Sequence, residues 1–295
     1  MHETIKNLLN ERPVISDGAW GTELQKQGLK PGESPEALNL ENPGIVEAVA
    51  ASYVEAGSRI VITNTFGGNR FTLESHGLED KVTEINKAGA EISKRAAGDK
   101  VLVFASVGPT GKMLMMGDVT EDELLDAFSE QAQALLAGGA DGLVIETMSD
   151  LEEAKIALAA CKATGLPVVA SMVYDAGDDF DRTMMGTTVE QATQELTEAG
   201  ADAIGSNCGQ GIEGFVKLCA TMKANTDLPV WIKGNAGLPE MVNGKTVYKT
   251  TPEEFASFAQ PLINEGADFI GGCCGTSPDF IRAVKRSLSQ GEALG

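Results

Sequence analysis

Histidine is nearly absent from this 295-residue sequence, which contains only His2 and His76. Histidine is the side chain most often used for acid–base catalysis near neutral pH, and it is a common metal ligand. His2 stands near the start of the chain, where we expect fraying, and His76 follows an apparent strand in a predicted surface loop. A catalytic or metal site built on histidine is therefore not expected.

Basic residues are also scarce, because 23 Lys and Arg stand against 43 Asp and Glu and give a formal net charge of −20. Nucleic-acid binding draws much of its affinity from basic contacts with phosphates, so nucleic acid is excluded as an expected partner. No apolar run approaches the roughly 18 to 20 residues that span a bilayer. The first residues also lack the basic and apolar regions of a secretory signal. We therefore expect a cytoplasmic protein without a membrane partner.

Short β-rich runs alternate with longer segments of helical periodicity, and this pattern is typical of a parallel sheet with crossover helices. Eight alternations in about 295 residues predict a single-domain (β/α)₈ TIM barrel of the α/β class. The predicted strands lie near 14–16, 60–63, 101–106, 142–146, 168–172, 203–207, 230–233 and 269–272. The predicted helices span 43–56, 80–97, 121–137, 150–164, 188–199, 213–225, 252–265 and 278–288.

No Ser/Gly linker, charge block or low-complexity stretch divides the chain, so residues 1–295 are expected to form one domain. Two long loops, at 175–182 and 234–251, follow predicted strands and would lie on the same rim of the barrel. Long loops within a compact domain are often functional. In a barrel of this kind the active site forms at the carboxyl ends of the strands, so the residues there are the informative ones.

Cysteine is the residue that stands out at the predicted strand ends. Cys208 ends the sixth strand, and Cys273 and Cys274 end the eighth. Alternate strands contribute to the same layer of a barrel, so the three sulfurs can converge on one point. Zinc favours such ligands, and a site with three protein ligands leaves a fourth position for substrate. Cys161 and Cys219 lie in predicted helices, where we expect ordinary buried thiols.

Two carboxylates also lie at strand ends. Glu146 ends the fourth strand, and Asp17 follows an apolar first strand. Each could bind an ammonium group or could simply cap the helix that follows. The turn 18–21 is rich in glycine and offers backbone N–H groups that could hold a carboxylate. It is not a dinucleotide-binding fingerprint, and the chain contains no P-loop.

The rim segments together resemble a known family. They are Asp17-Gly-Ala-Trp-Gly-Thr-Glu-Leu-Gln25, Thr63-Asn-Thr-Phe-Gly-Gly-Asn-Arg70, Glu146-Thr147, Gly205-Ser-Asn-Cys208, Asn235-Ala-Gly237 and Gly271-Gly-Cys-Cys-Gly-Thr276. In this order the chain resembles the zinc-dependent homocysteine S-methyltransferase family, and most closely the homocysteine-binding module at the amino end of cobalamin-dependent methionine synthase. The cysteine pair set within glycines, together with the Asn-Cys that precedes it, is the most specific part of the resemblance.

The resemblance implies a methyltransferase that methylates the thiol of homocysteine to give methionine. It implies that Cys208, Cys273 and Cys274 hold Zn²⁺ and that the homocysteine sulfur takes the open position. Gly234 stands where family members often have proline, and Trp20 where methionine or phenylalanine is frequent, so another thiol acceptor stays open. The residues implied to bind substrate are Asp17, Gly18, Ala19, Thr22, Glu146, Asn207 and Asn235.

The methyl donor is left open by the sequence. The corrinoid motif Asp-x-His-x-x-Gly is missing, so we expect a methylcobalamin or other corrinoid donor on a separate protein or on further modules. A small onium donor such as S-methylmethionine or betaine is the alternative. Two rival functions use other chemistry: a Schiff-base lyase or aldolase using Lys233, the only lysine so placed, or a non-catalytic zinc- or thiol-binding scaffold.

Overall fold

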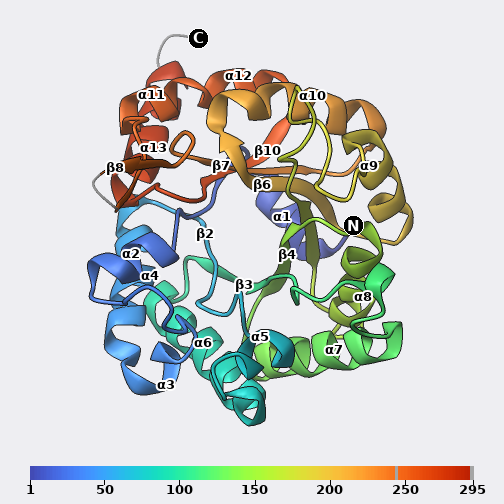
Figure 1. The fold of residues 1–295 in the computed structure, drawn as a ribbon. Helices are drawn as coiled ribbons and strands as arrows, with labels where there is room; N and C mark the ends of the chain where they lie inside the picture. The colour runs from blue at the N-terminus through green and yellow to red at the C-terminus, as the bar shows by residue number, and fades with distance from the viewer. Residues whose placement is uncertain (243–244, 293–295) are drawn as a thin grey trace.

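Eight parallel strands form a barrel surrounded by helices in the computed structural model, which describes residues 1–242 and 245–292 (Figure 1). The strands follow the order β1-β10-β7-β6-β5-β4-β3-β2. β1 and β2 stand at the two ends of this order, and the backbone N–H of Arg59 donates to the carbonyl of Ile15 across the gap (2.7 Å). The predicted (β/α)₈ barrel is confirmed.

All eight predicted strands are present, and β3, β4, β6 and β7 run further than the sequence indicated. β4 continues two residues past Glu146, and β6 continues past Cys208. The long loop at 234–251 contains a hairpin that was not predicted, because its strands are too short to show a periodicity. The barrel strands are β1 (Val14–Ile15), β2 (Ile60–Val61), β3 (Leu102–Val107), β4 (Gly142–Met148), β5 (Val168–Met172), β6 (Ala203–Gly211), β7 (Val230–Asn235) and β10 (Ala267–Gly272), and the hairpin strands are β8 (Glu240–Val242) and β9 (Lys245–Val247).

The predicted helices are present with small shifts, apart from the one predicted at 252–265. That segment forms two helices, because Pro261 has no N–H to continue the first one. The outer helices are α4 (Pro43–Ala56), α6 (Val82–Ala97), α7 (Glu121–Ala137), α8 (Leu151–Lys162), α9 (Val189–Glu198), α10 (Phe215–Asn225), α11 (Pro252–Ser257), α12 (Ala259–Asn264) and α13 (Pro278–Glu292). Four short helices were not predicted: α1 (Glu3–Leu9), α2 (Gly21–Lys26), α3 (Leu38–Glu41) and α5 (Arg70–Glu74).

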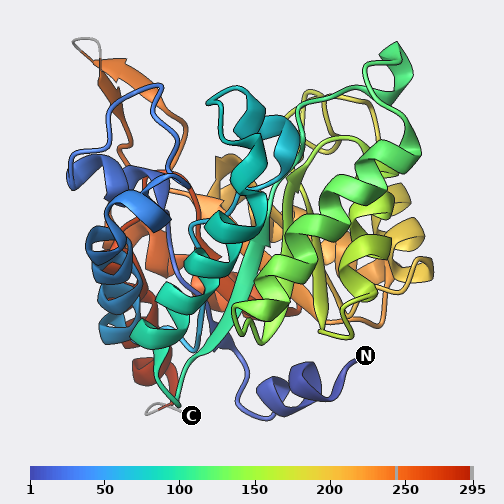
Figure 2. The ribbon, with the colours of Figure 1, turned by 90° about the horizontal axis from the view of Figure 1, so that it is seen from below.

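An apolar layer fills the barrel at the amino ends of the strands, and α1 covers it from below (Figure 2). Each strand contributes one buried side chain to this layer, and α1 adds Ile5 and Leu8. The Trp231 indole stacks on Phe104 at 6.3 Å between ring centroids. The strand residues of the layer are Val14, Ile60, Phe104, Val144, Val169, Ala203, Trp231 and Phe269.

The next inward layer lies two residues further along each strand, because side chains of a strand alternate between its faces. In contrast to the layer below, almost all of its members are polar or are glycine. Only Ile62 is apolar. The others are Ser16, Ser106, Glu146, Ser171, Gly205, Lys233 and Gly271, and each of these side chains that is polar is buried. The barrel interior therefore changes from apolar to polar on the way to the mouth.

Neither histidine belongs to the polar layer inside the barrel. His2 caps α1, because its imidazole accepts a hydrogen bond from Thr4 N (3.2 Å) while its own backbone N–H donates to Asp202 (2.7 Å). The expected fraying at His2 is therefore wrong. His76 is exposed in the turn after α5, as predicted.

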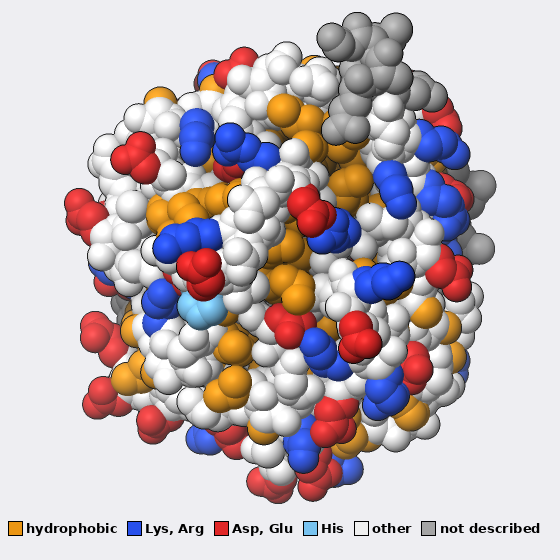
Figure 3. Space-filling view, turned by 180° about the vertical axis from the view of Figure 1, so that it is seen from behind, with side chains coloured by type: hydrophobic (Ala, Val, Ile, Leu, Met, Phe, Trp, Pro, Cys, Tyr) orange, Lys and Arg blue, Asp and Glu red, His pale blue; other side chains and the backbone are white. Residues whose placement is uncertain are grey.

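The face turned away in Figure 1 carries charges of both signs. Figure 3 shows Asp, Glu, Lys and Arg side chains interspersed there around a strip of apolar ones. Among the described residues, no helix has the length and apolarity needed to cross a membrane.

Helix α7 begins with a capping box that gives a first testable prediction. The Thr120 hydroxyl accepts from the backbone of Glu123, and the Glu123 carboxylate accepts from the backbone of Thr120 (2.9 Å). We expect Thr120→Ala to lower the free energy of unfolding by about 1 kcal/mol, because one N–H of the first turn loses its partner. Thr251→Ala on the matching box of α11 provides a second instance. Urea unfolding that is unchanged in both variants would contradict this assignment.

Candidate metal centre

Three cysteine sulfurs converge at the barrel mouth. The Sγ atoms of Cys208, Cys273 and Cys274 all lie within 4.8 Å of one another, and those of Cys208 and Cys274 are 3.7 Å apart. Cys208 lies in β6, and the other two follow the end of β10. β7 lies between these two strands in the sheet. The predicted convergence of sulfurs from two alternate strands is thus present in the structure.

Left-handed backbone conformations bring the sulfurs together. Cys208 has φ 62° and Gly209 has φ 77°, and the pairing of β6 with β7 is irregular at this point. Gly275 has φ 80° and lies under the Tyr248 ring, where a Cβ would clash. Residues other than glycine rarely adopt such φ values, and those that do cluster at functional sites. The chain therefore bends where the two cysteine segments need to meet.

The donor set fits a zinc ion. Three thiolates are the ligands that zinc prefers, and each of the three cysteines is partly exposed. The Oδ1 atom of Asn235 is buried nearby without a hydrogen-bond partner, so a polar position beside the sulfurs remains open. Hydrogen bonds from the other two thiols lower the pKa of Cys208, and the same coupling raises the pKa of Cys273. Proton sharing of this kind is expected where thiols crowd together.

The remaining cysteines take no part in this cluster. Cys161 is buried in α8 and Cys219 in α10, as predicted. Burial raises the pKa of each thiol to about 12. Both therefore stay protonated and act as small apolar side chains.

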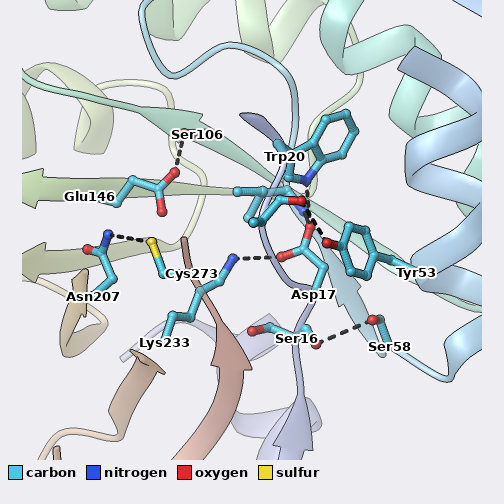
Figure 4. A network of polar contacts seen from close by, with 12 residues as sticks. Ser16, Asp17, Trp20, Tyr53, Ser58, Ser106, Glu146, Asn207, Lys233 and Cys273 are labelled. Carbon is cyan, nitrogen blue, oxygen red and sulfur yellow. Dashed lines mark hydrogen bonds and ion pairs between the residues drawn. The ribbon is translucent and has the colours of Figure 1, made fainter. Parts of the chain in front are cut away.

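Asn207 orients one of the sulfurs. Its Oδ1 accepts from Ser171 Oγ (2.7 Å) and from the backbone N–H of Thr147 (2.9 Å), which fixes which side of the amide carries the NH₂ group. That Nδ2 donates to Thr147 Oγ1 (2.6 Å) and points at Cys273 Sγ (3.8 Å), as Figure 4 shows. Asn207, predicted as a substrate-binding residue, therefore also supports the cysteine cluster.

A cavity of about 320 Å³ opens beside Cys208 and Cys274. Tyr248 lines it from the segment after β9, where its ring packs on Gly275. Asp175 lines it from the loop after β5, and its buried Oδ1 has no hydrogen-bond partner. The lining residues are Thr147, Ser149, Val173, Asp175, Cys208, Gly209, Asn235, Pro239, Tyr248 and Cys274.

Deeper in the barrel, below the sulfurs, Asp17 is surrounded by donors. Its Oδ1 accepts from Lys233 Nζ (2.7 Å), and its Oδ2 accepts from Trp20 Nε1 (2.8 Å) and from Ile62 N (2.8 Å). Both members of the ion pair are almost fully buried, at 0% and 2% exposure. Asp17 therefore does not cap a helix, which was the alternative considered for it.

Glu146 lies near Lys233 in the same polar layer. Its Oε1 accepts a hydrogen bond from Ser106 Oγ. Burial raises the pKa of Glu146, although the Lys233 charge acts in the opposite direction. No hydrogen bond to its Oε2 is formed by the described residues. This oxygen is thus available to a ligand.

The turn at 18–22 packs tightly against the cysteine segment. A Cβ at Gly18 would lie 2.8 Å from Thr276 Oγ1, so no larger residue fits there. The N–H of Ala19 already donates to Thr276 Oγ1 (3.1 Å). Thr22 Oγ1 is buried without a hydrogen-bond partner. Both residues were predicted to bind substrate. The Thr22 hydroxyl is free to do so, whereas the backbone N–H of Ala19 is already used.

Asp175, Tyr248, Thr147 and Ser171 take part in the site but were not predicted as site residues. Thr147 comes directly after the predicted fourth strand and Asp175 three residues after the fifth, so their position could have indicated them. Tyr248 lies at the end of the unpredicted hairpin, and Ser171 is internal to β5. For these two the sequence offers no local signal.

Sequence comparison places these features in a family. The model described as homocysteine S-methyltransferase matches residues 14–288. The chain is 30% identical over 301 residues to methionine synthase of Mycobacterium leprae (strain TN) and 30% identical over 302 residues to that of Mycobacterium tuberculosis (strain ATCC 25618 / H37Rv). Each match covers 96% of this chain and 25% of the relative, so the chain spans a quarter of the length of these proteins.

Solved structures share the fold. The homocysteine methyltransferase MmuM from Escherichia coli in its metallated form superposes with a TM-score of 0.80 at 23% identity. That match covers 96% of this chain and 99% of the other. The apo form of the same protein gives a TM-score of 0.74.

Proposed function

Because the chain belongs to the homocysteine S-methyltransferase family, we propose that it transfers a methyl group to the thiol of homocysteine and yields methionine. Residues 1–295 would act as the homocysteine-binding barrel unit, with Zn²⁺ held by Cys208, Cys273 and Cys274. The observation that carries the proposal is the convergence of these three sulfurs beside an open cavity. Reduced thiols of this kind fit a reducing compartment such as the cytoplasm.

Thiol activation is the chemistry that the site must supply. A free thiol is mostly protonated near neutral pH, whereas the thiolate is the nucleophile. Bound zinc would displace this proton and keep the acceptor sulfur reactive. The chain's own groups then orient the acceptor. Asn207 holds the Cys273 sulfur in place, and the open Oδ1 of Asn235 faces the same region.

The polar end of homocysteine would lie in the polar layer below the sulfurs. Glu146 presents a free carboxylate oxygen there, and Thr22 presents a free hydroxyl. Gly18 and Ala19 pack against Tyr53 and Thr276, so a larger side chain at residue 18 would not fit. Asp17 adjoins the same space, but its oxygens already accept three hydrogen bonds.

The methyl donor would reach the site over the barrel mouth, and we favour a methylated corrinoid carried by a separate protein or module. Support comes from the exposed apolar side chains of the described residues. Apart from Met1, and from Leu40 and Leu125 on α-helices, they lie on segments that follow barrel strands. They are Phe66, Met113, Met115, Met116, Phe180, Met184, Leu238, Met241 and Val247, and we call them the apolar rim. Exposed apolar patches around a site mark interaction surfaces.

The donor assay tests this function directly. The zinc-loaded protein would be incubated with homocysteine and, in separate reactions, methylcobalamin, S-methylmethionine or betaine, and methionine would be measured. We expect methionine from methylcobalamin. Methionine from S-methylmethionine or betaine alone would replace the corrinoid proposal with an onium donor. No methionine from any of the three, with zinc bound, would favour a scaffold that binds zinc without turnover.

The apolar rim gives a second prediction. Met184 (74% exposed) and Leu238 (53% exposed) adjoin the cavity-lining segments at Asp175 and Pro239. We expect Met184→Glu/Leu238→Glu to lower kcat/KM for methylcobalamin by roughly tenfold, because a large apolar donor would lose contacts at the mouth. The KM for homocysteine should not change.

A matched control lies on the outer surface of the barrel. Leu125 on α7 is 40% exposed and lies on an outer helix, and it does not line the cavity. Leu125→Glu should leave the kinetics with methylcobalamin unchanged. Equal losses in the control and the rim variant would show that the rim has no special role in donor binding.

The rival Schiff-base mechanism is disfavoured by the state of Lys233. An amine must be neutral to attack a carbonyl, but Lys233 forms a buried ion pair with Asp17. Borohydride treatment with carbonyl compounds should therefore trap no imine at this lysine.

A further inference from the structure

Thr147 on β4 has a left-handed backbone conformation, with φ 63°. Among the described residues, only two others that are not glycine have a positive φ, namely Phe180 and Cys208. A β-branched side chain makes this conformation costly, because the substituents on its Cβ crowd the backbone. The register of β4 against β5 also shifts between Ile145 and Met148, on either side of Thr147. Contacts around Thr147 must therefore hold it in this conformation.

Asn207 on β6 provides two of these contacts. Its Oδ1 accepts a hydrogen bond from the backbone N–H of Thr147 (2.9 Å), and its Nδ2 donates to Thr147 Oγ1 (2.6 Å). Because both ends of the amide group bind the same residue, the plane of the amide is fixed. Asn207 is 1% exposed, so little water competes for these bonds. The conformation of Thr147 and the orientation of the Asn207 amide are thus set together.

The amide of Asn207 has no capacity left for a ligand. A side-chain amide offers two N–H donors and two acceptor positions on its oxygen. The oxygen accepts from Thr147 N and from Ser171 Oγ (2.7 Å), which fills both positions. The nitrogen donates to Thr147 Oγ1 and to Cys273 Sγ (3.8 Å), as Figure 4 shows for the sulfur. The one group of Asn207 that reaches the cysteine cluster is therefore directed at a sulfur and not at a substrate.

A hydrogen bond to a thiolate acts on a metal centre in two ways. It holds the sulfur in one orientation, and it draws negative charge away from it. Asn207 also precedes Cys208 directly in the chain. The same residue thus adjoins one sulfur through the backbone and contacts the Cys273 sulfur with its side chain. A change in its orientation would disturb two of the three proposed ligands.

We propose that Thr147 is a positioning residue for the metal centre and acts through Asn207 on the Cys273 thiolate. Its left-handed backbone directs both its N–H and its Oγ1 at one amide, and this leaves the second N–H of that amide on the sulfur. The inference rests on the proposed function, because it assumes a metal ion held by the three cysteines. It assigns the orientation of one metal ligand to a residue that is not itself a ligand.

Zinc affinity tests the proposal first. The dissociation constant would be measured by competition with a chromophoric chelator. Thr147→Val keeps the branched shape but removes Oγ1, and we expect it to weaken zinc binding by about tenfold. Asn207→Leu should weaken it by about tenfold to a hundredfold, because the bond to the sulfur is lost altogether. Thr147→Ser keeps the hydroxyl and should bind zinc as the wild type does.

Cobalt(II) in place of zinc reports on the sulfurs without any need for turnover. Thr147→Val and Asn207→Leu should shift the sulfur-to-cobalt charge-transfer absorption to longer wavelength, because a thiolate without its hydrogen bond gives up charge more readily. Thr147→Ser should keep the wild-type absorption. A general loss of stability would not move this band, so the spectrum separates positioning of the sulfur from a merely structural role.

The double variant Thr147→Val/Asn207→Leu tests the route of the effect. If Thr147 acts through Asn207, the double variant binds zinc no more weakly than Asn207→Leu alone, because the two residues belong to one network. Independent residues would instead give losses that add. Additive losses would therefore overturn the inference.

Valine could prevent folding at φ 63°, so Thr147→Gly is the second variant, because glycine adopts this conformation freely. It lacks Oγ1 as well and should show the same weakening and the same spectral shift. Asn86 on α6 is a matched control, since its buried amide donates to the carbonyls of Gly68 (2.7 Å) and Val82 (2.8 Å). Asn86→Leu should leave zinc affinity and the cobalt spectrum unchanged.

The possible failures are distinguishable. If Thr147→Val and Thr147→Gly bind zinc as tightly as the wild type, with an unchanged cobalt spectrum, the role of Thr147 is overturned while the proposed function stands. An equal shift in Asn86→Leu would also overturn it, because any buried amide would then have the same effect. If the wild-type protein binds neither metal through its cysteines, the proposed function itself is overturned, and this inference with it.

Discussion

Cys273→Ser is expected to release bound zinc and abolish methyl transfer to homocysteine. The Cys273 sulfur lies within 4.8 Å of the other two and receives the Asn207 amide, so its loss removes one of three metal ligands and leaves a gap in the cluster. A serine hydroxyl is a poor substitute, because zinc in this kind of site prefers thiolate. Metal analysis after gel filtration and the methionine assay measure the two effects on the same sample.

Controls for this substitution come from the remaining cysteines. Cys161→Ala and Cys219→Ala remove thiols from helices far from the cluster and should keep both zinc and turnover. Full activity in Cys273→Ser protein that contains no zinc would end the proposed mechanism. Loss of zinc in the two control variants would instead mean that the metal binds at another site.

Asp17→Asn is expected to lower the free energy of unfolding by about 3 to 5 kcal/mol, because it leaves the Lys233 ammonium buried without a full counter-charge. The amide also cannot accept from all three of the groups that now donate to Asp17. Urea unfolding monitored by circular dichroism measures the change.

The double variant Asp17→Asn/Lys233→Met should recover most of this loss, because it removes the unpaired charge. An exposed pair offers the comparison. Lys87 and Glu91 lie 3.8 Å apart on the surface of α6, and Lys87→Met should change stability by less than about 0.5 kcal/mol. If Asp17→Asn lowers the free energy of unfolding no more than Lys87→Met does, water reaches the Asp17–Lys233 pair.

The barrel could be predicted from the sequence because its evidence is local. Each strand–helix unit carries its own change of periodicity, and α4 and α7 have the predicted bounds. The break at Phe258 could also have been foreseen from Pro261, since proline disrupts the helix turn that precedes it. The hairpin of β8 and β9 could not, because strands of this length show no periodicity of their own.

The sequence could predict which strand ends form the site, but it could not predict which of their side chains contact one another. The position of Cys208, Cys273 and Cys274 follows from strand order, so their convergence could be expected. The pairing of Lys233 with Asp17 depends on which inward side chains meet across the barrel. From the sequence, Asp17 was assigned to substrate binding and Lys233 to a rival Schiff-base mechanism, and nothing indicated that the two form an ion pair.

The change from an apolar to a polar interior divides the labour within the barrel. The apolar layer, which includes Trp231 and is covered by α1, contains none of the groups proposed for binding or chemistry. This apolar layer can hold the strands at a fixed spacing while residues of the polar layer change. Residues of the polar layer could therefore change during divergence while the apolar layer below them keeps the strands in place.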